Sequence, residues 1–545
     1  MLKLKSVIFE YNDGVDDFLT VTTQSVRNDY MSLEIVNDEN IFSASVHAEK
    51  EITIIKLTAV FEYIFTPTDR IFLNGYQSWT DSTEHRIDGK MRGLNHLPVN
   101  VVKKYEFSQY GDYNFVSYGR NEGEMHGFSY AYVRNHGDYS FLGSLNEDCG
   151  FTVIRTRTAQ NEIIVKKECS GLKVSSNYDG LKIYMCQGTE TEVFDGYFNE
   201  LGVKPRTDRK IYGYTSWYRH YQNINSDIIL SDLESFSTQK HSPDVFQIDD
   251  GWQSAVGDWL SPDSSKFPYG MQIIAESIRN SGMTPGLWFS PFICEENSEV
   301  FKNHKDWIVK DSSGNYVKGG SNWSGFYALD IYNEEVREYI RKVFDTVINE
   351  WGYGLVKLDF LYSACIIARD NKTRGQIMAD GIDFLRSCAG DTPILACGVP
   401  LASVFGKTEY CRIGCDVGSD WKGKPPVRFA HRERVSTKNS VLNTVFRRQL
   451  DGRAFLSDPD VFMLRTELNS MSDYQKHTLA EINSIGGSVL FTSDNVNEYT
   501  AEQSEFLTRI MHLREGRITG ADVGKDMLGI KVNFRGKNYT RKYHI

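Results

Sequence analysis

Val356-Lys-Leu-Asp359 is a short apolar stretch that reads as a buried strand ending on a carboxylate. Arg412-Ile-Gly-Cys-Asp416 has the same form and also ends on an aspartate. Buried parallel strands that end on polar residues are typical of a (β/α)₈ barrel, whose chemistry lies at the carboxyl ends of its strands. We therefore interpret both segments as strands of one barrel, the fourth and the sixth, which lie two apart so that their ends can face one pocket.

The chain around these segments alternates between expected strands and amphipathic helices from Ile211 onward. The helices include 333–351, 439–451 and 501–514. Eight such units match a TIM barrel in number and size. A flavodoxin-like open sheet needs fewer units and is the weaker alternative. The expected strands are 211–217, 245–252, 284–291, 354–362, 392–400, 410–417, 453–462 and 488–494.

The two ends of the chain read differently from this central part. Residues 1–205 show period-two alternation interrupted by Asn, Asp and Gly, as in 127–133, and no convincing long helix. Residues 516–545 contain two strand candidates around the turn 535–538. We predict a multidomain α/β protein: an N-terminal β-sandwich domain (1–205), a catalytic (β/α)₈ barrel (206–515) and a small C-terminal β element (516–545).

Composition narrows the class of protein and its partners. The formal net charge of -11 argues against nucleic acid as a partner. The sequence has no apolar run of about 18 residues, which argues against a membrane span. Its first 17 residues lack the pattern of a signal peptide. The nine cysteines form no CxxC pair, and we read them as reduced thiols of a cytoplasmic protein.

Asp359 and Asp416 suggest the chemistry of a retaining glycosidase. Such an enzyme uses one carboxylate as nucleophile and a second carboxyl group as acid/base, about 5–5.5 Å apart. Lys357 shares a face with Asp359 because side chains alternate along a strand, and its charge would keep that carboxylate ionised. Asp420 is the alternative acid. We favour Asp416 because Asp420 precedes Trp421 in an expected loop.

Other strand ends carry candidate binding residues. Asp249-Asp250-Gly-Trp252 offers acceptors for vicinal hydroxyls and an aromatic floor, although paired acids also ligate metals or lie solvated in loops. Trp217 and Trp288 end two more strands, where they either pack the barrel or form a carbohydrate platform. Cys397 is either a buried structural thiol or part of the sugar pocket. Asp458-Pro-Asp460 supplies supporting hydrogen bonds or forms a turn.

Over most of its length the chain resembles glycoside hydrolase family 36, the α-galactosidase (melibiase) family. Three features differ from many members. Leu358 replaces a tryptophan, and Cys397-Gly-Val-Pro-Leu401 replaces a glycine-rich stretch. An arginine before the fourth strand has no match near Tyr327-Ala-Leu-Asp330. The segments that carry the resemblance are Asn74–Trp79, Tyr212–Trp217, Phe246–Gln253, Gly257–Trp259, Lys266–Pro268, Gly286–Trp288, Val356–Asp359, Arg412–Asp416 and Ser457–Asp460.

The resemblance implies a β-supersandwich, a barrel and a short C-terminal β-domain. It also implies a retaining exo-α-galactosidase that acts on a small α-galactoside and needs no metal or other cofactor. Asp359 would be the nucleophile and Asp416 the acid/base. An oligomeric state does not transfer from the larger members, so a homo-oligomer stays open. The residues expected to contact the terminal galactose are Asp249, Asp250, Trp217, Trp288, Lys357 and Cys397.

Four rival functions remain open from the sequence. An α-N-acetylgalactosaminidase and a raffinose-synthase-like transglycosylase would use the same scaffold. A sugar-binding protein without catalysis would not need both Asp359 and Asp416. A metal-dependent hydrolase would use Asp249 and Asp250, but the sequence lacks a His-rich ligand set.

Overall fold

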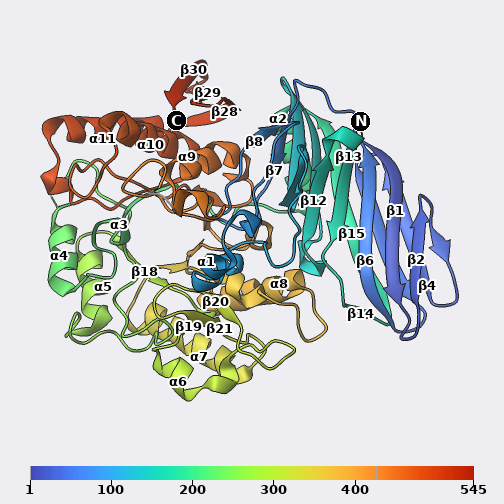
Figure 1. Ribbon diagram of the computed structural model, residues 1–545. Coiled ribbons are helices and arrows are strands. Elements are labelled where there is room, and N and C mark those ends of the chain that lie inside the picture. The colour runs from blue at the N-terminus through green and yellow to red at the C-terminus, as the bar shows by residue number, and fades with distance from the viewer. Residues whose placement is uncertain (1, 238, 424–426) are drawn as a thin grey trace.

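The computed structural model describes residues 2–237, 239–423 and 427–545. A β-sandwich built from the N-terminal part packs beside a barrel, and a small sheet from the C-terminus lies across one end of the barrel's helices (Figure 1). Within the described chain no helix is long and apolar enough to cross a membrane. The expected fold class, a barrel with flanking β domains, is confirmed, whereas the boundaries at 205 and 515 remain predictions.

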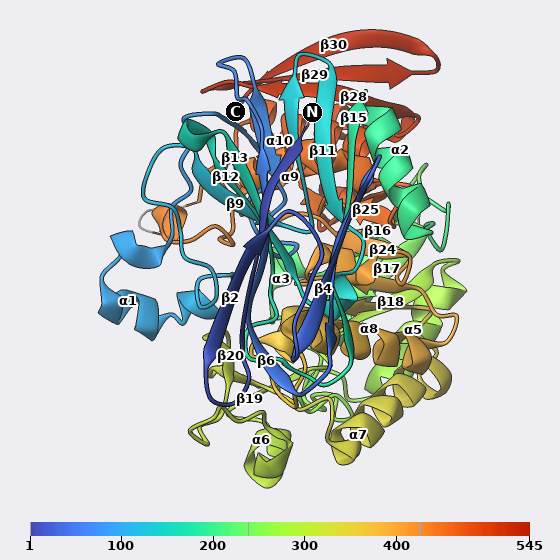
Figure 2. The same cartoon turned by 90° about the vertical axis from the view of Figure 1, so that its right-hand side faces the viewer.

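The N-terminal sandwich consists of two antiparallel sheets that pack face to face (Figure 2). Its strands bury alternate residues, as in β5 (Ile41–Ala48), where Phe42, Ala44 and Val46 point into the core. One sheet has the order β2 (Asp17–Thr22), β1 (Lys3–Asn12), β6 (Ile52–Glu62), β13 (Glu162–Lys167), β12 (Thr152–Arg157), β9 (Glu124–Phe128), with β14 (Lys173–Val174) beside β6. The other has the order β3 (Val26–Arg27), β4 (Met31–Asp38), β5 (Ile41–Ala48), β15 (Asn177–Gly188), β11 (Asp138–Ser144), β10 (Tyr130–Asn135), β7 (Arg70–Leu73), β8 (Glu84–Arg86).

Two details of the N-terminal part differ from the sequence analysis. The alternating segment 127–133 is not one strand, because Ser129 has a φ of 66° and the chain passes there from β9 in one sheet to β10 in the other. The expected absence of a long helix is wrong, since α2 spans Glu190–Leu201. Its N-terminus carries a capping box formed by Thr189 and Glu192, which the sequence analysis overlooked.

The central parallel sheet closes into the predicted barrel. A strand lies within every one of the expected strand segments. Closure occurs at residues 456–462, where β25 pairs with β24 and the following β26 pairs with β27. The order is β25 (Leu456–Asp458), β24 (Tyr410–Arg412), β23 (Ile394–Ala396), β22 (Leu355–Leu358), β18 (Thr284–Phe289), β17 (Val245–Ile248), β16 (Ile211–Thr215), β27 (Val489–Thr492), β26 (Val461–Phe462).

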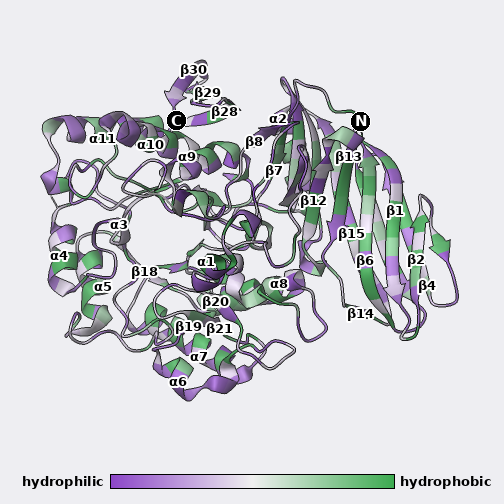
Figure 3. Cartoon of the chain, in the orientation of Figure 1, coloured by the Kyte–Doolittle hydropathy of each residue, from purple (hydrophilic) through white to green (hydrophobic). Residues whose placement is uncertain are grey.

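Helices surround the barrel and present mixed apolar and polar faces, visible as alternating green and purple (Figure 3). The three helices expected from periodicity are observed as α7, α9 and α11. The helices are α3 (Trp217–His220), α4 (Ser226–Glu234), α5 (Gly270–Asn280), α6 (Glu299–Asn303), α7 (Glu334–Asp345), α8 (Arg374–Ala389), α9 (Thr437–Phe446), α10 (Asp473–Gly486) and α11 (Ala501–Leu513), with α1 (Val99–Lys104) in the N-terminal part.

Two small antiparallel sheets complete the fold. One lies in the loop region between β18 and β22 and pairs β19 (Ile293–Glu295), β21 (Phe326–Ala328) and β20 (Lys318–Gly320). The C-terminal sheet pairs β28 (Gly516–Val523), β29 (Met527–Phe534) and β30 (Lys537–His544). The expected hairpin is present at β29 and β30, and β28 adds a strand that the sequence analysis did not foresee.

Candidate active site

A pocket of about 460 Å³ opens at the carboxyl ends of the barrel strands. This volume is within the range of about 300–1,000 Å³ that small-molecule sites occupy. The structure brings together there all but one of the predicted site residues. Those that line the pocket are Trp217, Asp249, Asp250, Trp288, Lys357, Asp359 and Asp416.

Asp359 follows β22 directly and is 8% exposed. Its Oδ2 accepts a hydrogen bond from Trp288 Nε1 at 3.1 Å, and its Oδ1 accepts one from the Phe360 backbone N–H at 2.8 Å. Burial raises the pKa of Asp359, while Lys357 and the Trp288 hydrogen bond act in the opposite direction. Two donors thus fix a partly desolvated carboxylate in the wall of the pocket.

Lys357 is held by Asp249, which follows β17, two strands away from β22 in the barrel. The Lys357 Nζ lies 2.8 Å from Asp249 Oδ2. Burial alone would lower the pKa of Lys357, but the Asp249 carboxylate outweighs burial and raises it. Gln247 Nε2 also donates to Asp249 Oδ2 at 2.7 Å, and the Asp249 backbone N–H donates to Ser216 Oγ at 2.9 Å. The ion pair is therefore rigid and keeps Lys357 charged beside the nucleophile candidate.

Asp250 is the second of the paired acids. Its carboxylate accepts hydrogen bonds from Gln222 Nε2 at 2.9 Å, Gln253 Nε2 at 2.6 Å and Trp323 Nε1 at 2.8 Å. Burial raises the pKa of Asp250, and these donors oppose the increase. Both oxygens are fixed in orientation, as a carboxylate that accepts from sugar hydroxyls requires.

Asp416 is oriented by Arg412 at the end of β24. Arg412 Nη2 donates a hydrogen bond to Asp416 Oδ1 at 2.7 Å. The same atom lies 2.5 Å from Asp460 Oδ2. Asp460 Oδ2 also accepts from Tyr218 Oη at 2.5 Å and from the Val417 backbone N–H at 2.8 Å. Asp460 therefore supports Asp416 through its arginine partner and through the next peptide group. The segment also turns at this point, since Asp460 has a φ of 79° and its backbone N–H donates to Asp458 Oδ1 at 2.8 Å, so both readings of 458–460 apply.

Asp420, the alternative acid, is not among the residues that line the pocket. Its carboxylate accepts a hydrogen bond from the Gly423 backbone N–H, and its carbonyl accepts one from Thr437 Oγ1 at 2.7 Å. It therefore stabilises its own loop. Asp416, by contrast, has a side chain that is 37% exposed and lines the pocket.

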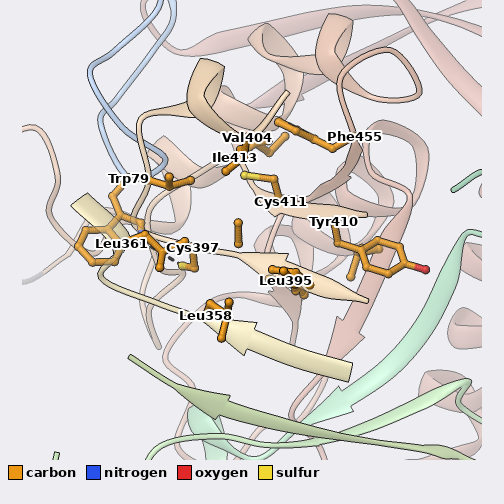
Figure 4. Packing of buried hydrophobic residues seen from close by; sticks show 14 of the residues in the cluster. Trp79, Leu358, Leu361, Leu395, Cys397, Val404, Tyr410, Cys411, Ile413 and Phe455 are labelled. Carbon is orange, nitrogen blue, oxygen red and sulfur yellow. Dashed lines mark hydrogen bonds between the residues drawn. The ribbon is translucent and has the colours of Figure 1, made fainter. Parts of the chain in front are cut away.

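Cys397 lies behind the pocket wall. It is 1% exposed, and its Sγ accepts a hydrogen bond from Trp79 Nε1 at 3.4 Å. Figure 4 shows Trp79 reaching from the N-terminal part toward Cys397 and Leu361. Trp79 itself lines the pocket. Cys397 therefore supports a pocket residue, and its direct contact with a sugar stays a prediction.

The aromatic floor attributed to Trp252 is wrong. Trp252 is 0% exposed, its Nε1 donates to the Trp288 carbonyl at 2.9 Å, and its ring packs edge-on against Trp351, so it belongs to the buried core. Trp323, from the loop between β20 and β21, lines the pocket in its place and bonds to Asp250. Its position two residues before Gly325, in a loop without periodicity, gave no signal in the sequence.

The N-terminal part contributes a wall that the sequence analysis did not predict. Tyr105, Phe107 and Tyr110 line the pocket from the segment after α1. Tyr110 Oη donates to Asn322 Oδ1 at 2.5 Å and accepts from the Ser321 N–H at 2.8 Å, which ties this segment to the barrel. In the sequence, only the resemblance of segment 74–79 to the family had suggested that the N-terminal part contributes residues to the site.

That segment is anchored by a buried arginine. Arg447, which follows α9, is 0% exposed. It donates to Asn74 Oδ1 at 3.0 Å and to the carbonyls of Ser78 at 2.7 Å and Ile413 at 2.9 Å. Burial lowers its pKa to about 10. One guanidinium thus connects the loop that carries Trp79 with the strand that leads to Asp416.

The pocket holds the two candidate catalytic carboxyl groups, one fixed lysine and several fixed hydrogen-bond acceptors. In residues 2–237, 239–423 and 427–545 no group of three or more His, Cys, Asp or Glu side chains is arranged to hold a metal ion. The arrangement can supply acid/base and nucleophilic chemistry from its own side chains.

Sequence comparisons agree with this geometry. The sequence model of the family described as Melibiase matches residues 207–375. An α-galactosidase of Escherichia coli is 30% identical over 151 residues, which are 26% of this chain and 20% of that protein. An α-galactosidase of Lactobacillus acidophilus is 22% identical over 331 residues, 57% of this chain and 42% of that protein. The matches thus cover less than half of each of these curated relatives.

Solved structures extend the likeness to nearly the whole chain. An α-galactosidase from Thermus thermophilus, in complex with p-nitrophenyl α-D-galactopyranoside, is 25% identical with a TM-score of 0.74, covering 95% of this chain and 98% of that one. A family 36 α-galactosidase from Geobacillus stearothermophilus shares the fold at 12% identity, with a TM-score of 0.62 over 98% of this chain and 77% of that one. Residues 207–375 thus match the Melibiase family, and the chain as a whole shares the fold of a family 36 α-galactosidase.

Proposed function

We propose that this protein is a retaining exo-α-galactosidase that removes terminal α-linked galactose from oligosaccharides by double displacement. The observation that carries the proposal is the presence of Asp359 and Asp416 in the wall of one pocket, each held by its own donors. The family relationship and the galactoside bound to the Thermus thermophilus structure support the choice of galactose.

In the first half-reaction, protonated Asp416 gives its proton to the glycosidic oxygen as the bond from C1 to that oxygen breaks. Asp359 attacks C1 from the opposite face and forms a galactosyl ester. In the second half-reaction, Asp416 takes a proton from water, which attacks C1 and releases Asp359. The two inversions give net retention of the α configuration.

The fixed acids bind the sugar in this proposal. Asp249 and Asp250 accept hydrogen bonds from vicinal hydroxyls, and Lys357 donates to one of them. Because Asp249 and Lys357 are already paired and Asp250 has three donors, little side-chain entropy is lost on binding. Trp217 and Trp288 supply apolar faces for the ring, and Cys397 with Trp79 limits its depth.

NMR spectroscopy of the first-formed anomer tests the mechanism. We expect α-galactose to appear before mutarotation. Asp359→Gly should lower kcat by several orders of magnitude, and added azide should restore turnover as β-galactosyl azide. First formation of β-galactose, or near-normal activity of Asp359→Gly, would refute the assignment.

One comparison favours a second candidate. A protein of Flavonifractor plautii described as an A type blood α-D-galactosamine galactosaminidase is 29% identical over 151 residues. A panel of p-nitrophenyl α-galactoside, α-N-acetylgalactosaminide and α-glucoside separates the two functions. We expect the galactoside to have the highest kcat/KM. The same assay with added sucrose measures transfer to a sugar hydroxyl against hydrolysis.

A further inference from the structure

The leaving group of the proposed reaction lies on the Asp416 side of the pocket, because Asp416 protonates the leaving oxygen. The segment 431–436 packs against this side. The Ser436 backbone N–H donates to the Asp416 carbonyl at 3.0 Å, and the same segment places His431 and Arg434 in the pocket wall. His431 and Arg434 therefore lie on the side of the pocket from which the leaving group of the proposed reaction departs.

A second cavity, of about 250 Å³, begins at these two residues. We call it the annex. His431 and Arg434 line both spaces, so the annex adjoins the pocket at these two residues. Its walls come from residues 81–96 of the N-terminal part and 428–434 of the barrel. The charged side chains that line it are Asp81, Lys90, Arg92, Arg428, Arg432 and Arg434.

The cations of the annex exceed the carboxylates that neutralise them. Arg432 is paired with Asp81, with Nε 2.7 Å from Oδ1. Across the part of the chain that the structure describes, the guanidinium groups of Arg92, Arg428 and Arg434 form no ion pair with a carboxylate. The Nε atoms of Arg428 and Arg434 are buried and have no hydrogen-bond partner among the described residues.

This concentration of positive charge stands out in a chain of net charge -11. Positive charges that face one cavity repel each other, which destabilises the empty cavity. A bound anion attracts these charges and offsets the repulsion. Guanidinium groups match phosphate oxygens with two parallel hydrogen bonds, which makes arginine clusters typical of phosphate recognition. A neutral sugar can accept hydrogen bonds from these donors, but it does not offset their positive charge.

We propose that the annex binds a phosphoryl group carried by the aglycone, so that phosphorylated α-galactosides are preferred substrates. This proposal rests on the proposed galactosidase function and adds the chemical class of the leaving group. Arg92 and Arg428 hold the phosphate in the annex, and Arg434 binds it at the junction with the pocket.

The test compares α-galactosylglycerol with its glycerol-phosphate counterpart, which differ only in the anionic group. At low ionic strength we expect kcat/KM to be about tenfold higher for the phosphorylated compound, and NaCl to reduce this ratio by screening. Arg92→Gln and Arg428→Gln should each lower the ratio about threefold. Arg517→Gln, which removes an exposed arginine on β28, is the matched control and should leave the ratio unchanged.

α-Galactosyl fluoride separates this proposal from the proposed function, because its leaving group cannot reach the annex. If the wild type does not cleave the fluoride, the galactosidase proposal fails. If the wild type cleaves the fluoride but treats the two glycerol compounds alike, the annex proposal fails and the function stands. A preference for phosphate that survives Arg92→Gln and Arg428→Gln would also overturn it.

Discussion

Lys357 Nζ lies 2.8 Å from Asp249 Oδ2, so the lysine on the nucleophile strand is paired directly with the acid at the end of β17. Its influence on Asp359 acts through space, by lowering a pKa that burial raises. Lys357 therefore acts on two carboxylates. It neutralises Asp249, and it favours the ionised form of Asp359.

Lys357→Met tests both roles. Loss of the cation disfavours the Asp359 carboxylate, so the pKa of Asp359 should rise and the acidic limb of kcat/KM should move to higher pH. Asp249 would keep a buried, unpaired charge, which should lower the free energy of unfolding by about 3–5 kcal/mol. The measurements are a pH–rate profile and a urea denaturation curve.

Lys302→Met is the control, since it breaks an exposed pair with Glu299 on α6. It should change neither the profile nor the stability measurably. An unchanged acidic limb in Lys357→Met would show that the lysine does not influence the nucleophile.

Much of the barrel could be predicted because its strands are buried on both faces and read as short apolar runs that end on polar residues. The residues of the site that end those strands followed from the same rule. Trp323, Tyr105 and Tyr110 could not be predicted, because they lie in loops whose positions depend on tertiary contacts. Ser129 was missed for a related reason: a single residue with positive φ redirects the chain without breaking the alternating pattern.

Replacement of Asp416 and of Asp420 should affect kcat/KM differently on substrates with good and with poor leaving groups. A general acid matters most for a poor leaving group and contributes about 10²–10⁴-fold to rate. Asp416→Ala should therefore lower kcat/KM by about that factor on sugar galactosides, with a far smaller loss on dinitrophenyl galactoside. Asp420→Ala, which affects only loop hydrogen bonds, should change both substrates alike. Leaving-group dependence in Asp420→Ala alone would reverse the assignment.

Chelation tests the proposed independence from metals. Exhaustive dialysis against EDTA should leave kcat and KM unchanged, because Asp249 is neutralised by Lys357 and Asp250 is held by amide and indole donors. Loss of activity that a divalent ion restores would reassign these two acids to a metal site.

Arg447 connects the loop of the N-terminal part that carries Trp79 with the barrel segment that leads to Asp416. Its guanidinium binds the loop that carries Trp79 and also the Ile413 carbonyl three residues before Asp416. Arg447→Met would leave several buried carbonyl acceptors unpaired, at about 1–3 kcal/mol for each group that water cannot reach. The loop should then release Trp79 from Cys397, raising KM for galactosides more than it lowers kcat.

Arg447→Lys keeps the positive charge but has fewer hydrogen-bond donors. It should therefore fold even if Arg447→Met does not, and it should raise KM more than it lowers kcat, to a smaller extent than Arg447→Met.

Arg453→Met is the matched control. Arg453 Nε pairs with Asp195 of α2 at 2.7 Å, so it also joins the N-terminal part to the barrel, but it does not line the pocket. Its removal should leave KM and kcat unchanged. If Arg447→Lys and Arg453→Met shift KM equally, the effect comes from general contact between the two parts, and Arg447 has no specific role in placing Trp79.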